Sequence, residues 1–284
     1  MARVLLLLML LVSYPSIAMD GEPAFSVMSF NIRCGFCEPP DDVNHWSRRK
    51  ALVADLIGKH DPDLIGLQEA VIDQARDLAG LMPQYDWIGV GREDGKEQGE
   101  ANIVMFKRSR FELLEHKTLW LSPTPGVIGK GWDAAFNRTL TMARLRDRRN
   151  GRELWLLDTH FDHQGVQARV ESARLIVRLR ASLDTQLPLV LVGDFNSTRE
   201  SEAYPLLADA LHDSARISRS PPRGGEVSFN DFGKGREPGR LIDFIFVSDA
   251  VDVLSYRILT KRYRGRYPSD HFPVLVRLRM RTAP

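Results

Sequence analysis

The sequence predicts an α/β protein in which two mixed, mostly antiparallel sheets pack face to face with helices outside. Three observations favour this class. Many short apolar segments are typical of strands, the few helical segments stand between some of these strands as crossovers, and the charged turn 147–151 contains an Asn-Gly pair that is typical of a hairpin. Hairpins beside helical crossovers indicate sheets that contain both antiparallel and parallel pairs.

Residues 1–18 have the pattern of an export signal. Arg3 precedes the apolar run at 4–12, and small residues that end at Ala18 follow it. The run is far shorter than the ~20 residues that a membrane-spanning helix needs. We therefore expect cleavage near Ala18, a protein that is periplasmic or secreted, and a mature chain without a transmembrane segment. No composition break divides 19–284, which predicts a single domain.

Composition and charge limit the possible functions. Of 284 residues, 43% are hydrophobic and 27% are charged, which is typical of a folded protein with a large core. The formal net charge is +2, and removal of Arg3 brings the chain close to neutrality. A protein that grips nucleic acid through bulk charge carries far more, so duplex DNA is not favoured as a partner. We find neither a solenoid repeat nor a low-complexity segment.

The first third of the chain alternates strands and helices. Residues 24–32 alternate like a strand, and a loop rich in Pro and Asp leads to Ser47, a good N-cap. The helix that follows ends before Pro62 and places four apolar residues on one face: Leu52, Val53, Leu56 and Ile57. Residues 63–69, DLIGLQE, predict a strand, and a helix to about residue 81 follows it.

The remainder is richer in strands. Five strands are expected at 85–90, 101–106, 111–121, 138–146 and 153–160. The next segment has a helical period, with Val166, Val170, Ala173 and Val177 facing the core. A buried strand at 187–193, LPLVLVG, comes next, then a short helix at 201–208. Three last strands are centred near Leu241, Leu254 and Val274.

Cys34 and Cys37 form a C-x-x-C pair. In an exported protein a local disulfide is the favoured interpretation, and a thioredoxin-like redox site is the alternative. The redox site needs a helix that begins at the first Cys. Here the sequence continues as Glu-Pro-Pro-Asp-Asp, which is typical of a loop.

Polar side chains stand where apolar runs stop. Each alone is explained by a turn, a helix cap or a surface position. Asp243 is harder to explain so, because it lies within the apolar segment 241–247, where a carboxylate is costly without a partner. The candidates are Asn31, Glu69, His160, Asp162, His163, Asp194, Asn196, Asp243, Asp270 and His271.

Most of these residues belong to six short motifs whose types and order resemble those of the endonuclease/exonuclease/phosphatase superfamily, which includes deoxyribonuclease I-like phosphoesterases. They are Asn31, Leu67-Gln68-Glu69, Thr159-His160-Phe161, Gly193-Asp194-Phe195-Asn196, Asp243 and Ser269-Asp270-His271. The resemblance covers nearly all of 19–284. It implies a four-layered α/β/β/α sandwich and hydrolysis of phosphate esters with a divalent metal, usually Mg²⁺, for which Mn²⁺ could substitute.

The resemblance also implies roles. Glu69 and Asp270 would bind the metal, with Asn31 as a neutral ligand or a support for the ligands, since Mg²⁺ prefers oxygen donors. Asp194 would orient and deprotonate the attacking water. Three residues would donate hydrogen bonds to the phosphoryl oxygens: Asn196, His160 and His271, the last held by Asp243.

Some positions depart from the family pattern. Asp158 stands where members often have Asn, and Asp162 and His163 could contact substrate, bind a second metal or shape the loop. Arg138, like His163, is a candidate substrate contact. The loops at 33–46, 92–100, 122–137 and 219–237 should rim the site. The Gly-rich stretch 126–132 lacks the spacing of a nucleotide-binding P-loop.

The favoured function is therefore an exported, divalent-metal-dependent phosphodiesterase that acts on a small or surface-presented ester. The alternatives are an endonuclease or a phosphomonoesterase of the same fold and, in another class, a non-catalytic binding protein. The sequence determines neither the substrate nor the oligomeric state.

Overall fold

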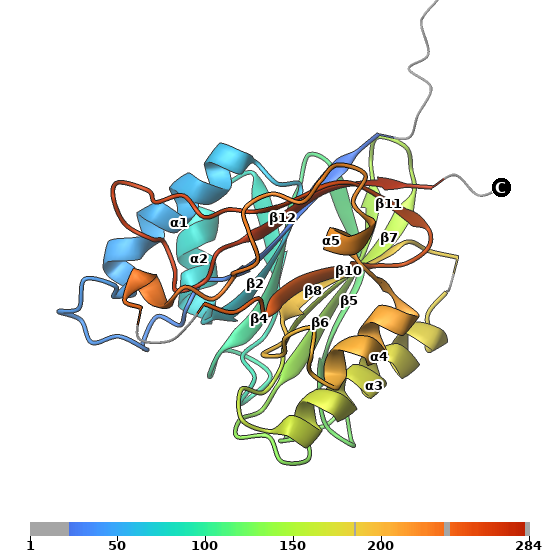
Figure 1. The fold of residues 1–284 in the computed structure, drawn as a ribbon, viewed down its shortest axis with the longest axis horizontal. Coiled ribbons are helices and arrows are strands. Elements are labelled where there is room, and N and C mark those ends of the chain that lie inside the picture. The colour runs from blue at the N-terminus through green and yellow to red at the C-terminus, as the bar shows by residue number, and fades with distance from the viewer. Residues whose placement is uncertain (1–22, 185, 236–238, 282–284) are drawn as a thin grey trace, which may run out of the picture.

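A computed structural model describes residues 23–184, 186–235 and 239–281. The expected signal at 1–18 lies outside these residues. Within the described part of the chain, no helix is both long and apolar enough to cross a membrane. Figure 1 shows two sheets stacked between helices.

Each sheet has six strands. The first has the order β11-β12-β1-β2-β4-β3, and the second has the order β5-β6-β7-β8-β10-β9. In the first sheet β1 and β2 are parallel and the other pairs are antiparallel; in the second sheet the parallel pair is β7 and β8. The strands are β1 (Phe25–Asn31), β2 (Leu64–Ala70), β3 (Tyr85–Ile88), β4 (Ala101–Lys107), β5 (Phe111–Trp120), β6 (Thr139–Asp147), β7 (Glu153–His160), β8 (Leu189–Asp194), β9 (His212–Asp213), β10 (Asp243–Val247), β11 (Val251–Ile258) and β12 (Val274–Met280).

Helical crossovers join the strands of each parallel pair. The helices are α1 (Trp46–His60), α2 (Ile72–Leu81), α3 (Val166–Ser182), α4 (Ala203–Ala210) and α5 (Ser214–Ile217), with a 3₁₀ turn η1 (Asp231–Gly233). α1 connects β1 to β2, and α3 connects β7 to β8.

Three apolar clusters fill the spaces between four layers. One joins the facing sides of the two sheets, the second joins the first sheet to α1 and α2, and the third joins the second sheet to α3 and α4. Alternation along β1 produces this division, because Val27 points into the first cluster and Met28 into the second. The predicted α/β/β/α sandwich is confirmed.

The facing sheets approach closely at Gly66 in β2. A Cβ atom there would lie 2.3 Å from Val192 Cγ2 and 2.9 Å from Asp158 Cγ, both on the opposite sheet. Only glycine fits this separation without displacement of the neighbouring groups.

The hairpin predicted at 147–151 is also confirmed, since β6 and β7 pair across it and Gly151 has φ +74°.

Two details of the sequence prediction are wrong. His45, and not Ser47, is the N-cap of α1, because its side chain accepts a hydrogen bond from the backbone N–H of Ser47. Val166 is exposed, because it is the first residue of α3 and precedes the turn that reaches the sheet.

The end of α1 agrees with the prediction: Asp61 ends the helix in the left-handed conformation, φ 46°, just before Pro62.

Candidate active site

The polar residues predicted from the sequence gather at one edge of the two sheets. The parallel pairs β1–β2 and β7–β8 bring their carboxyl ends there. β10 and β12 are antiparallel to their neighbours, so they begin at this edge. Asp243, Asp270 and His271 therefore stand at or before strand starts, where the sequence had suggested strand ends. The edge collects Asn31, Glu69, His160, Asp194, Asn196, Asp243, Asp270 and His271.

Asn31 links the two sheets. Its Nδ2 donates to Glu69 Oε1 and to Asp194 Oδ2, each at 3.0 Å. Its Oδ1 accepts from the backbone N–H of Arg33, also at 3.0 Å. Asn31 therefore orients the two carboxylates, and its Oδ1 keeps a second lone pair, so this geometry is compatible with both roles that the sequence left open, metal ligand and support.

His271 is a buried imidazole held by a buried carboxylate. Its Nδ1 lies 2.8 Å from Asp243 Oδ2, and its Nε2 lies 3.7 Å from Asp194 Oδ2. Burial alone lowers the pKa of an imidazole, but Asp243, Asp194 and Asp270 outweigh it and raise the pKa of His271 to about 10. At neutral pH this residue is a cation.

His160 and Asn196 form a second pair. Asn196 Nδ2 lies 3.0 Å from His160 Nε2 and 3.0 Å from the carbonyl oxygen of Phe161, which fixes the amide. The backbone N–H of Asn196 donates to Asp194 Oδ1 at 2.9 Å. Burial, and then the charges of Arg138 and Arg92, hold the pKa of His160 well below its usual range, so His160 is neutral.

Carboxylates crowd this edge. Burial and the neighbouring Asp243 raise the pKa of Asp194 to about 7, and burial together with the charge of Glu69 raises the pKa of Asp270. Burial opposes ionisation of Glu69 too, but Arg33 and the hydrogen bond from Asn31 lower its pKa. Single ligand atoms of Glu69, Asp194 and His271 lie within 4.8 Å of one another. The crowded carboxylates of this edge are oxygen donors that repel one another, which fits a hard divalent cation, whereas protonated His271 is not a ligand for one.

Three residues at this edge have left-handed backbone angles that non-glycine residues rarely adopt: Arg33 (φ 59°), Glu69 (φ 58°) and Asn196 (φ 45°). The register of β2 against β4 shifts between Leu67 and Ala70, so Glu69 stands in an irregularity of the strand. Strained conformations of this kind concentrate at functional sites, where a side chain must be aimed.

Arg33 escaped the sequence analysis. Its guanidinium lies 3.0 Å from Glu38 Oε1 and 3.7 Å from both Glu69 Oε2 and Asp270 Oδ2. Burial lowers the pKa of an arginine, but these three carboxylates raise it. Its position two residues after Asn31, just past a strand end, was the one signal that could have identified it.

The fully buried Arg49 of α1 fixes the loops around Arg33. It donates to the carbonyl oxygens of Ile32 and Pro268, both at 2.8 Å, and to that of Asn44. Burial lowers the pKa of Arg49 to about 10. Through these bonds α1 ties the end of β1 to the segment that carries Asp270.

Glu100 was also missed, although it ends the loop 92–100 that was expected to rim the site. Its Oε2 lies 2.5 Å from Arg92 Nη1 and 4.0 Å from His160 Nδ1. Burial, and then the charge of Glu69, raise the pKa of Glu100 to about 7, so these two carboxylates repel one another.

Arg138 is a buried arginine whose guanidinium binds two side chains of the loop that follows β7. Its Nε donates to Asp162 Oδ2 at 3.2 Å and its Nη2 lies 3.1 Å from His163 Nδ1. Its Nη1 is buried and has no partner among the residues that the structure describes. Asp162 also accepts from the backbone N–H groups of Gln164 and Gly165, so it shapes the loop as well as holding Arg138.

These residues surround one cleft of about 580 Å³. Residues from all four predicted rim loops line it, whereas 126–132 does not. The volume is within the range of small-molecule sites. The lining includes Arg33, Phe36, Cys37, Glu69, Arg92, Glu93, Glu100, Phe136, Arg138, His160, His163, Asp194, Asn196, Phe229, Arg240, Asp270 and His271.

Comparisons with known proteins agree with this geometry. The family model described as "Endonuclease/Exonuclease/phosphatase family" matches residues 28–271. A family protein of Bacteroides thetaiotaomicron is 34% identical with a TM-score of 0.86, and the match covers 92% of this chain and 99% of that one. A mannosyl-6-phosphatase of the same organism is 35% identical with a TM-score of 0.83, covering 89% and 99%. Nocturnin of Drosophila melanogaster is 28% identical over 85% of this chain, which spans only 43% of nocturnin.

Proposed function

Because the chain belongs to the endonuclease/exonuclease/phosphatase family and is a hydrolase of phosphoester bonds, we propose that it hydrolyses a small phosphate monoester, with a sugar phosphate as the first candidate. The observation that carries this proposal concerns Arg138, a buried residue of the cleft lining whose Nη1 has no hydrogen-bond partner among the described residues. A buried donor without a partner is costly, and an anionic oxygen of the substrate would satisfy it.

The number of donors favours a monoester over the phosphodiester that the sequence suggested. A terminal phosphate has three non-bridging oxygens and up to two negative charges, whereas a diester has two such oxygens and one charge. The cationic side chains that line the cleft are Arg33, Arg92, Arg138, Arg240 and His271. A more highly charged phosphate uses more of them.

The cleft has room for a sugar ring beyond the phosphate. Phe136 is 46% exposed and its ring stacks on His163, with centroids 5.7 Å apart. Exposed aromatic faces pack against the apolar side of a sugar ring, while Glu93 supplies acceptors for hydroxyl groups. The mannosyl-6-phosphatase with 35% identity supports this choice of substrate class.

The residues of the chain divide the chemistry between them. Asp194, whose pKa lies near neutrality, takes a proton from the attacking water. The imidazolium of His271, which lies beside Asp194 Oδ2, donates to a phosphoryl oxygen, and the backbone N–H of Asn196 holds Asp194 Oδ1. Glu69 and Asp270 would hold a Mg²⁺ ion, for which Mn²⁺ could substitute, and the bound ion would neutralise charge on the phosphoryl group.

Turnover of mannose 6-phosphate, p-nitrophenyl phosphate, bis-p-nitrophenyl phosphate and plasmid DNA, each with Mg²⁺, with Mn²⁺ and with a chelator, tests this function. We expect metal-dependent hydrolysis of the monoesters and little action on the plasmid. If the diester or the plasmid is cleaved faster than every monoester, the monoester assignment is wrong, although the family activity stands. Full activity in the presence of the chelator would contradict the proposed dependence on a divalent metal.

The variant Arg138→Lys tests whether the guanidinium of Arg138 binds the substrate. Lysine keeps the charge but loses the planar fork, so kcat/KM for the monoester should fall about tenfold, the effect of ~1.4 kcal/mol. Arg146→Lys is the matched control, because Arg146 lies on β6, which begins directly after Arg138, and pairs with Glu153 outside the cleft. Equal kinetics for the two variants would remove Arg138 from the substrate site.

We also propose that the chain is exported and cleaved near Ala18. The amino-terminal signal pattern and the Cys34–Cys37 disulfide support this proposal. Amino-terminal sequencing of protein recovered from outside the cytoplasm should begin at or near Met19. An intact Met1 there would refute cleavage.

A further inference from the structure

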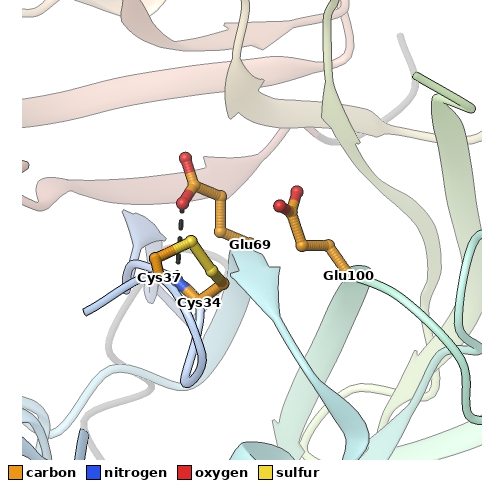
Figure 2. A group of neighbouring side chains, drawn as sticks. All are labelled: Cys34, Cys37, Glu69 and Glu100. Atoms are coloured by element: carbon orange, nitrogen blue, oxygen red, sulfur yellow. Dashed lines mark hydrogen bonds between the residues drawn. A yellow bond between two sulfur atoms is a disulfide. The ribbon is translucent and has the colours of Figure 1, made fainter. Parts of the chain in front are cut away.

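The loop after β1 places two sulfur atoms beside two carboxylates at the lip of the cleft. Cys34 and Cys37 form a disulfide, and Figure 2 shows it next to Glu69 and Glu100. One sulfur from each cysteine and one carboxylate oxygen from each glutamate all lie within 4.8 Å of one another.

Hydrogen bonds and an ion pair already hold the two glutamates of this cluster in place. The backbone N–H of Cys34 donates to Glu69 Oε2 at 3.4 Å, which holds that carboxylate against the loop. Arg92 holds Glu100 from the other side at 2.5 Å. Cys34 is buried and the other three residues are half-buried, so the cluster can be reached from the cleft.

The donor set of this cluster changes when the disulfide is reduced. Disulfide sulfurs are poor metal ligands, whereas two thiolates at C-x-x-C spacing are the usual sulfur pair of structural Zn²⁺ sites. Two thiolates and two carboxylates supply four ligands, the number that tetrahedral Zn²⁺ takes. Mg²⁺ disfavours sulfur, so this set selects a different ion from the oxygen cluster around Asp194.

We propose that reduction of the Cys34–Cys37 disulfide converts this cluster into a Zn²⁺ site with Cys34, Cys37, Glu69 and Glu100 as ligands. With a phosphine reductant, two electrons pass to the disulfide, the S–S bond breaks, and the phosphine takes oxygen from water to become its oxide. The two water protons go to the sulfurs. Zn²⁺ then displaces both protons as it binds the thiolates.

The geometry gives this site an effect on the cleft. Glu69 also belongs to the group with Asp194 and His271, and its two oxygens face different partners, Oε2 toward Cys34 and Oε1 toward Asn31. Zn²⁺ bound at Oε2 in the reduced protein would therefore place a second cation beside the oxygen donors of the cleft. The binding itself does not depend on which phosphate ester the protein cleaves, so it can be measured apart from turnover.

The test uses the full chain and Co²⁺ as a spectroscopic substitute for Zn²⁺. Metal-free protein is titrated with Co²⁺ before and after phosphine treatment. We expect thiolate-to-cobalt charge-transfer absorption that saturates at one equivalent in the reduced protein and is absent in the oxidised protein. Added Zn²⁺ should abolish the absorption by displacing Co²⁺.

Three variants assign the ligands. The double variant Cys34→Ser, Cys37→Ser should lose the absorption under reducing conditions. Glu100→Gln should keep it but bind Co²⁺ at least tenfold more weakly, a loss of ~1.4 kcal/mol. Glu93→Gln is the matched control, because Glu93 lines the same cleft but lies outside the four-residue cluster.

The proposal is overturned if the reduced protein shows no thiolate absorption, or if Glu100→Gln and Glu93→Gln bind Co²⁺ with the same affinity. Circular dichroism of each reduced sample verifies that the fold is intact, and a reduced protein that unfolds would also refute the proposal. A reduced protein that binds Co²⁺ as expected but hydrolyses no monoester would leave the zinc site standing and reject only the proposed substrate.

Discussion

Asp243 sets the charge state of the imidazole that faces Asp194. It lies 2.8 Å from His271 Nδ1, and after the opposing effect of burial it is the largest influence on the pKa of His271, which rises to about 10. A raised pKa keeps the proton on His271 at neutral pH and releases it only as pH rises through about 10. A single buried carboxylate thus keeps a cationic donor in the cleft across the physiological range.

The variant Asp243→Asn should lower the pKa of His271 by about one to three units, the usual effect of one close opposite charge. Activity that requires the imidazolium would then fall at lower pH than in the wild type. The alkaline limb of the kcat/KM profile measures this shift. Asp249→Asn is the control, because it disrupts an exposed His–Asp pair with His212, and it should leave the limb in place. Coincident limbs for Asp243→Asn and the wild type would contradict the prediction.

Asp158 shows the cost of a buried carboxyl group. Its Oδ1 accepts from Gln68 Nε2 at 2.6 Å, whereas its Oδ2 and Gln68 Oε1 have no partner among the described residues. Burial raises the pKa of Asp158 well above its ordinary value. In the unfolded chain the same carboxyl group ionises with a pKa of about 3.9. The unfolded state is therefore stabilised relative to the folded state as pH rises above that value.

The variant Asp158→Asn should therefore stabilise the protein. An amide retains the acceptor for Gln68 Nε2 and adds a donor for Gln68 Oε1. We expect a gain of roughly 1–3 kcal/mol at neutral pH, the cost of an unsatisfied buried polar group. Urea unfolding at several pH values measures it, and the gain over wild type should grow between about pH 4 and 7. A gain that stays constant or shrinks as pH rises would reject this account.

At the scale of elements, the apolar strands act as mounts for polar ends. β8 is buried over its whole length and delivers Asp194 to the edge, and β2 does the same for Glu69 up to its irregular last turn. These residues could be predicted, because an apolar run of strand length that stops at a carboxylate can be recognised in the amino-acid sequence alone.

Other parts of the site could not be predicted. Arg33, Arg92 and Glu100 lie in loops without periodicity, among 39 basic and 37 acidic residues of the chain, and only tertiary structure turns them toward the cleft. Whether Asp243 ends or begins its strand depends on the antiparallel pairing of β10 with β8, which no local pattern reveals. The cap of α1 was misassigned because an imidazole can accept a hydrogen bond as a serine hydroxyl does.

Gly66 in β2 tests how tightly the two sheets are packed. In Gly66→Ala the new methyl group would meet Val192 and Asp158 of the opposite sheet, and overpacking of this kind costs about 1–3 kcal/mol. Gly58→Ala in α1 is the control, since nothing lies within 4 Å of its Cβ and alanine favours a helix by up to ~1 kcal/mol. Thermal unfolding should show opposite shifts, and a Gly66→Ala protein as stable as the wild type would contradict the close packing.

At the scale of the whole molecule, the strand that closes the first sheet comes from the far end of the chain. β12 pairs with β1, and Phe25 lies opposite Leu278, so both ends of the described chain meet at one side of the sandwich (Figure 1). The connection from β4 to β5, by contrast, is a short surface turn at Arg108 and Ser109 that leads from one sheet to the other.

A chain that is joined through a flexible Gly/Ser linker from Arg281 to Pro23 and opened between Arg108 and Ser109 should fold. It keeps every strand pairing of both sheets and the cleft at their edge, so we expect a cooperative unfolding transition and metal-dependent hydrolysis within about tenfold of the unpermuted protein. Calorimetry and turnover measure the two properties. A permuted chain that is soluble but lacks a cooperative transition would show that the original connection is essential.

The strand orders of the two sheets have a further meaning, because they correspond term by term: β11-β12-β1-β2-β4-β3 against β5-β6-β7-β8-β10-β9. The helices match as well, with α1 and α2 corresponding to α3 and α4. The two strands of the first sheet that match the leading pair β5 and β6 stand at the end of the chain, as β11 and β12. Glu100 before β4 and Asp243 at the start of β10 occupy matching places in the two strand orders, and each lies near a histidine of the other sheet, His160 and His271. Neither sheet alone supplies both members of either pair, so the cleft forms only where the two sheets face each other.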